Sequence, residues 1–159
     1  MKIIAFDLGK NMAWASNWSG KSIRKETTIN THSFLLKGDV RAHRLHSLLS
    51  YLLCNHADLP GHDIVVYETP FARGRDATRS LWGIAGIIEA CATNAGLPVV
   101  DVAVPTIKKF ATGHGKASKD QMIIAAQRMG YVGTNEHEAD AVCLLRYAEA
   151  NLERVLDPK

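Results

Sequence analysis

The sequence predicts one α/β domain in which a mixed five-stranded sheet carries helices on both of its faces. Two observations favour this class. Short segments with strand character fill the first thirty residues, and longer helical patterns then alternate with apolar strands. The length of 159 residues and the apolar content of 47% are ordinary for a globular domain, so we expect residues 1–159 to form a single unit.

The first thirty residues contain three strand candidates in succession. Residues 2–9 (KIIAFDLG) end in a turn at Gly9, residues 12–20 alternate with a two-residue period, and residues 22–29 form a more polar third strand. Because short turns join them, the three segments predict an antiparallel meander.

Helices and apolar strands then alternate. Residues 39–57 carry leucines at helical spacing, and residues 63–68 (DIVVYE) form the continuous apolar run expected of a strand buried on both faces. Residues 77–96 predict a helix that ends at Gly96, a residue type suited to a C-terminal cap.

The last third of the chain completes the sheet and its covering helices. Residues 97–103 (LPVVDVA) predict the fifth strand, residues 118–130 a helix with Ser118 at its N-cap, and residues 136–153 the last helix. The resulting order, β-β-β-α-β-α-β-α-α, is typical of a ribonuclease H-like fold.

Composition narrows the class of protein. No run of about 18 apolar residues occurs, and the N-terminus has the pattern of a strand, so neither a membrane span nor a signal peptide is expected. Cys54, Cys91 and Cys143 are scattered and form no framework, which favours a reducing cytoplasm. The net charge of +3 and the pI of about 8.8 permit a nucleic-acid partner.

Two carboxylates follow hydrophobic strands. Asp7 and Glu68 lie near the C-terminal ends of strands that we expect to be parallel neighbours, and open α/β sheets place their functional sites at such ends. Taken singly, Asp7 is equally explained as the start of a turn and Glu68 as the end of a strand.

A third carboxylate lies inside the apolar register of the last helix. An unpaired carboxylate there costs free energy, so Asp140 needs a partner or a metal ion. His137 precedes it by three residues and shares its helical face, which continues through Leu144 into the core. Glu136 and Glu138 are explained as solvent-facing residues at the helix start, and His137 alone would be explained in the same way.

These side chains form a coherent donor set. Three carboxylates and one neutral imidazole suit hard divalent cations, Mg²⁺ or Mn²⁺, and the imidazole favours Mn²⁺ somewhat. Scattered cysteines argue against zinc. Two ions about 4 Å apart would hold the attacking and leaving oxygens of a phosphoryl transfer. We therefore predict a two-metal site and no small-molecule cofactor.

A basic stretch lies between the fifth strand and the next helix. In IKKFATGHGKASK (107–119), four lysines surround two glycines, so backbone amides and ammonium groups together predict a phosphate-holding surface. The alternative is a solvated basic loop. The lysines are Lys108, Lys109, Lys116 and Lys119, and the last opposes the dipole of the helix that it begins.

The segment after Glu68 combines one aromatic residue with several arginines. Phe71, Arg73, Arg75 and Arg79 follow the strand end, a composition that suits a loop guiding a nucleic-acid strand. The alternative for Phe71 is a residue tucked into the core.

The helix behind this loop is apolar nearly all round. Residues 81–91 (LWGIAGIIEAC) therefore predict burial against the sheet on one side and against a second copy of the chain on the other, giving a homodimer. Trp14 and Trp18 are expected to pack on the sheet and not to contact DNA.

These motifs resemble the RuvC-type Holliday junction resolvases. The resemblance rests on FDLG, YETPF, PTIKKFATGHGKASKDQM and HEADA, which cover nearly the whole chain in the family's order. Its most specific part is the pattern of Lys108, Gly113, Gly115 and Lys119. The size agrees with a compact member of the family, such as a viral one, which would act in the host cytoplasm.

The resemblance implies a function in DNA recombination and repair. It implies a magnesium-dependent homodimeric endonuclease, also supported by Mn²⁺, that resolves four-way junctions by paired nicks leaving 5′-phosphate and 3′-hydroxyl ends. It also implies a role for each motif residue. Asp7, Glu68, His137 and Asp140 would bind two ions; Lys108 and Lys119 would lie beside the scissile phosphate; Phe71 would probe the crossover. The family carries either Asp or His at the position of His137.

Three other functions are compatible with parts of the pattern. The DLG motif is shared with actin- and hexokinase-like ATPases, which need two such domains. A related nuclease acting on RNA/DNA hybrids or on other branched DNA is the second, and a junction-binding protein without cleavage activity is the third. The complete set of four ligands argues against the third.

Overall fold

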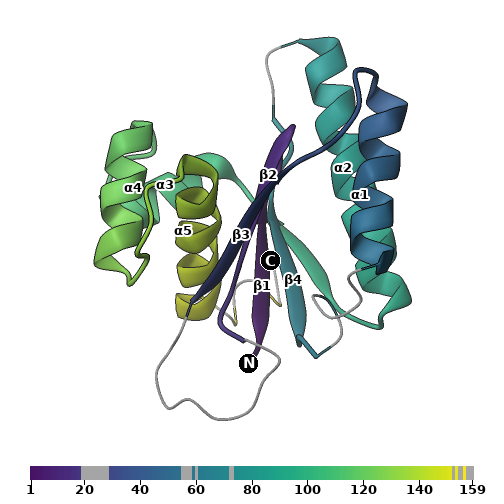
Figure 1. Ribbon diagram of the computed structural model, residues 1–159. Coiled ribbons are helices and arrows are strands. Elements are labelled where there is room, and N and C mark those ends of the chain that lie inside the picture. The colour runs from purple at the N-terminus through teal and green to yellow at the C-terminus, as the bar shows by residue number, and fades with distance from the viewer. Residues whose placement is uncertain are drawn as a thin grey trace.

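Figure 1 shows the computed structural model, in which one mixed sheet separates two layers of helices. The structure describes residues 1–18, 29–54, 59, 61–71, 74–151, 153 and 156. The strands are β1 (Ile3–Asp7), β2 (Asn11–Ser16), β3 (Asn30–Leu35), β4 (Ile64–Glu68) and β5 (Val99–Val102). The helices are α1 (Arg41–Cys54), α2 (Arg75–Asn94), α3 (Val104–Thr112), α4 (Lys119–Arg128) and α5 (Glu136–Ala150).

The strand order β3-β2-β1-β4-β5 confirms the mixed sheet. β1 pairs antiparallel with β2, and β2 with β3, whereas β1 and β4 run parallel, as do β4 and β5. In the β1–β4 ladder Phe6 pairs with Tyr67. The next residues, Asp7 and Glu68, are the last residues of these two neighbouring strands, so they lie side by side at the end of the sheet.

Each face of the sheet is covered by its own helices, because successive side chains of a strand point to opposite faces. Ile3 and Ala5 of β1 belong to the core shared with α4 and α5, while Ile4 and Phe6 belong to the core shared with α1 and α2. The expected arrangement with helices on both faces is confirmed (Figure 1).

Helices α1 and α2 lie side by side and run in the same direction. Near their starts, Gly83 of α2 packs so closely on Leu45 that an added Cβ would lie 3.1 Å from the leucine methyl carbons. Near their ends, Leu52 of α1 and Cys91 of α2 line the same pocket. The first turns of both helices therefore lie at the same edge of the sheet, where β4 ends and leads into α2.

Tyr67, which points to the sheet face opposite to that of Glu68, attaches strand β4 to α2. Tyr67 is buried and donates a hydrogen bond to Glu89 of α2. Burial and the neighbouring Glu89 carboxylate raise the pKa of the Tyr67 hydroxyl, so the phenol remains a donor.

The third strand differs from the sequence prediction. Residues 19–28 lie outside the described residues, so the strand proposed over 22–29 falls almost entirely outside them, and the third strand of the sheet is Asn30–Leu35. Its sequence, NTHSFL, lacks a sustained apolar run because the strand lies at the sheet edge and is only half buried.

Helix α3 is absent from the predicted element order, and the loop interpretation of its residues is wrong. It spans nine residues, of which Ile107 is buried, so its apolar periodicity is weak. Pro105 lies in its first turn, where proline is compatible with a helix, and Gly113 ends it in a left-handed conformation with φ of 82°.

The other predicted helices are confirmed within a few residues. Ser118 caps α4 as predicted: its Oγ accepts from the Gln121 backbone N–H, and its own N–H donates to Gln121 Oε1 at 2.8 Å. Gly96 follows the end of α2 with φ of 71°. None of the described helices has the length and apolarity needed to cross a membrane.

Candidate active site

The end of β1 and the end of β4 together form an acidic edge. Asp7 and Glu68 point to the same sheet face as Ala5 and Val66, which is the face covered by α5. Asp7 is only 5% exposed. The two carboxyl groups are close enough for the charge of Asp7 to raise the pKa of Glu68.

Helix α5 brings the remaining predicted ligands to this edge. Its N-cap residue Asn135 accepts hydrogen bonds from the backbone N–H groups of His137 and Glu138, which fixes the first turn. The His137 Nδ1 atom lies 2.8 Å from Asp7 Oδ2, and Asp140 follows one turn later on the same face.

Burial and mutual repulsion raise the pKa values of the three carboxyl groups. The pKa of Glu68 lies well above its usual range because of burial first, and then because of the Asp7 and Asp140 carboxylates. Burial and the Asp7 carboxylate raise the pKa of Asp140 to about 6. Burial also raises the pKa of Asp7, although its hydrogen bond to His137 acts in the opposite direction. The cluster is thus short of positive charge.

His137 supplies part of that charge. Its hydrogen bond to Asp7 raises the pKa of the imidazole above its usual value. The other ring nitrogen, Nε2, lies 3.6 Å from Glu136 Oε1, so the ring is placed between two carboxyl groups.

The chemistry of this donor set matches a hard divalent cation, since three carboxyl groups and one imidazole lie together and lack compensating charge. The side chains are not, however, arranged as ligands: across the described ranges, no group of three or more His, Cys, Asp or Glu residues has a geometry that could hold an ion. Asp7 is instead hydrogen-bonded to His137. The cluster is a hydrogen-bonded one with the composition of a metal site.

Two predicted lysines lie beside the carboxyl groups. Lys108 Nζ donates to the Ala117 carbonyl at 3.0 Å, and its charge lowers the pKa values of Glu68 and Asp140. Lys119 is 73% exposed and forms a 2.6 Å ion pair with Glu136 Oε2, which raises the pKa of Lys119.

The glycines of the basic stretch do not play the predicted role of offering free backbone amides to a phosphate. The Gly113 N–H donates to the Lys109 carbonyl at 2.9 Å, so this amide ends α3 and is not free for a phosphate. Gly115 passes close to Pro105, whose carbonyl oxygen would lie 3.3 Å from an added Cβ. Lys109 and Lys116 are exposed.

The segment after Glu68 projects from the acidic edge. Thr69 is held by Asp101, whose Oδ2 atom accepts from its Oγ1 at 2.5 Å. Phe71 is 80% exposed, so the alternative of a core residue is wrong. Arg75 and Arg79 are exposed in the first turns of α2, and Arg73 lies outside the described residues.

Two glutamates have roles that the sequence interpretation missed. Glu138 does not face solvent; it accepts hydrogen bonds from Thr31 at 2.8 Å, Ser33 at 2.9 Å and Tyr131 at 3.0 Å, and so fastens α5 to β3. Glu136 is the ion-pair partner of Lys119. The alternating hydroxyls of Thr31 and Ser33 were the available signal, since two hydroxyls on one strand face require acceptors.

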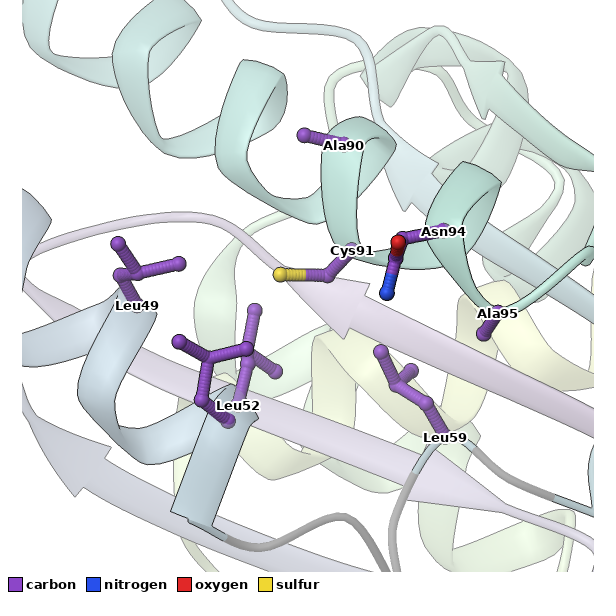
Figure 2. A pocket seen from close by; sticks show the side chains of 8 residues that line it. Leu49, Leu52, Leu59, Ala90, Cys91, Asn94 and Ala95 are labelled. Atoms are coloured by element: carbon purple, nitrogen blue, oxygen red, sulfur yellow. The ribbon is translucent and has the colours of Figure 1, made fainter.

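Helix α2 leaves one apolar stripe exposed. Ile84 and Ile88 are buried against the sheet, whereas Trp82, Gly86 and Ala90 are exposed at intervals of four residues. Trp82 is 50% exposed. At its far end the α1–α2 pair encloses an apolar pocket of 220 Å³; Figure 2 shows Cys91 pointing into it from α2 and Leu49 and Leu52 lining it from α1.

Comparison with known proteins gives consistent matches. The chain is 32% identical over 106 residues to the crossover junction endodeoxyribonuclease RuvC of Acidiphilium cryptum, a match covering 65% of this chain and 62% of that protein. It is 43% identical over 60 residues to the RuvC of an Anaeromyxobacter species (strain Fw109-5), covering 37% of this chain and 29% of that protein. The chain thus spans less than two thirds of these relatives. No protein-family model matches the sequence.

Solved structures share the fold over nearly the whole chain. Thermus thermophilus RuvC superposes with a TM-score of 0.64 at 17% identity, covering 94% of this chain and 96% of that one. T. thermophilus RuvC in complex with a Holliday junction substrate superposes with a TM-score of 0.65 at 18% identity, covering 91% and 90%. The chain therefore has the ribonuclease H-like fold of RuvC, and the resemblance to RuvC-type resolvases that its motifs predict is confirmed in sequence and in fold.

Proposed function

We propose that residues 1–159 form a divalent-metal-dependent endodeoxyribonuclease domain that resolves four-way DNA junctions by paired nicks. The observation that carries the proposal is the convergence of Asp7, Glu68, His137 and Asp140 at one sheet edge, with Lys108 and Lys119 beside them. The similarity to RuvC proteins, one of them solved with a Holliday junction substrate, supports branched DNA as the substrate.

The acidic cluster would hold Mg²⁺, with Mn²⁺ as an active substitute. Asp7, Glu68, His137 and Asp140 are the proposed ligands, and the raised carboxyl pKa values are what such a site shows before a cation compensates its charge. Two ions held by these residues would supply an activated water and charge stabilisation for the leaving oxygen, and the products would carry 5′-phosphate and 3′-hydroxyl ends.

The chain's own residues orient the phosphate and offset its charge. Lys108 is held by the Ala117 carbonyl, so its ammonium group lies fixed beside the carboxyl cluster. Lys119 is exposed, and its only ion pair among the described residues is with Glu136, so an incoming phosphate would compete with that carboxylate. Both cations would stabilise the charge that builds up in the transition state.

The junction would reach the cluster along the projecting segment. Phe71 is exposed close to Glu68, as an aromatic residue that stacks on bases at a crossover would be. The predicted DNA-binding cations would contact phosphates through interactions that weaken with salt. They are Arg73, Arg75, Arg79, Lys109 and Lys116. A second copy of the chain, packed on the exposed stripe of α2, would supply the second site for paired nicks.

A side-by-side cleavage assay tests the proposal. Four-way, three-way, flap and linear DNA are incubated with the protein in Mg²⁺ or Mn²⁺, and the ends of each product are analysed. We expect preferential cutting of the four-way junction in both metals, with 5′-phosphate ends. Asp7→Asn should retain binding and lose cleavage, because an amide is a poor ligand for a hard cation. Equal cutting of flaps and junctions would instead indicate a general branched-DNA nuclease.

A further inference from the structure

The loop between β3 and α1 is fixed against its neighbours at the edge of the sheet that carries Asp7. The Leu36 N–H donates to the Lys10 carbonyl at 2.9 Å, which joins this loop to the β1–β2 turn. The Lys37 N–H donates to Ser47 Oγ of α1 at 3.2 Å. Gly38, with φ of 118°, lies so close to α1 that an added Cβ would clash with the His43 side chain at 2.3 Å.

This fixed loop and its neighbours present three cations to solvent. Lys10, Lys37 and Arg41 are all exposed, and none of them has an ion-pair partner among the residues that the structure describes. The nearby acid, Asp39, is engaged by the Val40 N–H and by His43 Nδ1 at 3.1 Å. We refer to Lys10, Lys37 and Arg41 as the α1 basic surface.

Helix stability does not account for these charges. The first turn of α1 contains no acidic residue, and Arg41 and Arg44 lie there at the positive end of the helix dipole, where cations are unfavourable. Arg44 is used internally, since its guanidinium donates to the carbonyls of Gly38 and Asp39. Neither the helix dipole nor an ion pair within the described residues therefore explains the exposed cations.

The α1 basic surface lies near Arg75 and Arg79, which are proposed above to contact DNA. Because α1 and α2 pack side by side in the same direction, the start of α1 lies beside the start of α2, which carries Arg75 and Arg79 (Figure 1). Lys10 follows Asp7 by three residues in the turn that leaves β1. The surface thus lies at the same edge of the sheet as the acidic cluster, but on the face covered by α1, whereas Asp7 and Glu68 point to the face covered by α5.

We propose that the α1 basic surface binds the phosphate backbone of a DNA arm that leads away from the cleavage site. This inference rests on the proposed function, which places a phosphodiester at the acidic cluster. A duplex arm that leaves the acidic edge toward α1 would pass over this surface, where exposed cations on a fixed loop suit contacts with backbone phosphates. Such contacts hold the register of DNA and carry no sequence preference.

Salt-dependent binding tests the proposal. The wild type and a combined Lys10→Ala, Lys37→Ala, Arg41→Ala variant are titrated with a four-way junction and with linear duplex, in Ca²⁺, over a range of salt concentrations. Each lost contact should reduce the slope of log K against log salt by about 0.9, so the triple variant should lose between about 2 and 3 from the slope. Affinity at 0.15 M salt should fall roughly fivefold for each contact.

Two variants control the comparison. Arg128→Ala removes an equally exposed cation in the last turn of α4, away from the acidic cluster, and should leave the slope unchanged. A triple glutamine variant keeps more of each side chain, so that the fold is preserved if alanine disturbs it. The rate of cleavage in the fully bound complex should remain within about twofold of the wild type.

The outcomes separate this surface from the nuclease itself. Suppose that the wild type cuts junctions and that the triple variants bind DNA with the same affinity and the same salt slope as the wild type. The proposed role of the α1 basic surface is then wrong, and the proposed function stands. If the wild type binds duplex without cutting junctions, and the variants lose slope, the surface stands and the proposed function fails. An absence of DNA binding by the wild type overturns both.

Discussion

Asp140 shows that a carboxyl group within an apolar helical register can indicate a functional site from the sequence, before any ligand of that site is known. Its place in an apolar register predicted a partner, and the structure provides Asp7, His137 and Lys108 as electrostatic neighbours. The position of each proposed ligand near the end of a strand or the start of a helix was readable from the sequence. The hydrogen bond between His137 and Asp7 was not, because it depends on how far α5 slides along the sheet.

The raised pKa of Asp140 predicts a pH-dependent stability. A carboxyl group with a folded-state pKa of about 6 binds its proton more tightly than in the unfolded chain, so its favourable contribution is present below about pH 4 and is lost as the pH rises toward 6. With divalent ions chelated, the free energy of unfolding of the wild type relative to Asp140→Asn should fall by roughly 2 kcal/mol over this range. Denaturant titrations at intervals of pH measure it, and a difference that rises with pH would contradict the assignment.

Lys119 and Arg75 are expected to act at different stages of the reaction. Lys119→Ala should lower the single-turnover cleavage rate by on the order of 100-fold and lower affinity much less, because its charge matters most in the transition state. Arg75→Ala should weaken binding and reduce its salt dependence, with a smaller effect on the rate of the bound complex. Single-turnover rates with binding isotherms measure both, and equal losses of rate and affinity for Lys119→Ala would remove its catalytic role.

Phe71 is expected to act on the crossover. Since it is exposed, Phe71→Ala should leave stability within about 0.5 kcal/mol of the wild type. It should reduce cleavage of four-way junctions more than cleavage of flaps, because only a crossover has stacked arms to separate. Equal losses on the two substrates would show that Phe71 is not a junction probe.

At the scale of elements, the sequence was informative wherever an apolar face repeats over several turns or along a buried strand. Strands β1, β4 and β5 and helices α1, α2, α4 and α5 have such patterns. The two missed elements lack them: β3 is a half-buried edge strand, and α3 buries little beyond Ile107. Their conformation follows from neighbours that no local pattern records.

The attachment of α5 to β3 gives a prediction at this scale. Glu138→Ala leaves the hydroxyls of Thr31 and Ser33 without this acceptor, so it should reduce the free energy of unfolding by about 2–3 kcal/mol. The Tyr131 hydroxyl loses its 3.0 Å bond to Glu138 and keeps the weaker one to the Asn135 carbonyl at 3.4 Å. The exposed Glu153→Ala serves as the control and should change it by less than about 0.5 kcal/mol. Thermal and denaturant unfolding measure both, and similar small effects would show that the network contributes little.

At the scale of the whole molecule, the exposed stripe of α2 predicts a homodimer. Gly86 lies in the middle of this stripe, and an added side chain there would meet nothing within 4 Å in the protomer. Gly86→Glu should therefore leave the fold intact and convert a dimer to a monomer, because it places a charge in an apolar interface. Sedimentation at micromolar concentration measures it, with Ile124→Glu on α4 as the control. A monomeric wild type would remove the basis for paired nicks.

The hydrogen bond from Tyr67 to Glu89 would give such a dimer a short mechanical link to the proposed metal site. Tyr67 and Glu68 are consecutive, and they point to opposite faces of β4, so one peptide unit links the helix that would meet the partner protomer to a proposed metal ligand. A shift of α2 by the second copy would pull on the same strand that holds Glu68. Paired nicks in one junction would need timing as well as symmetry, and in the proposed dimer this linkage would let each protomer sense the position of the other.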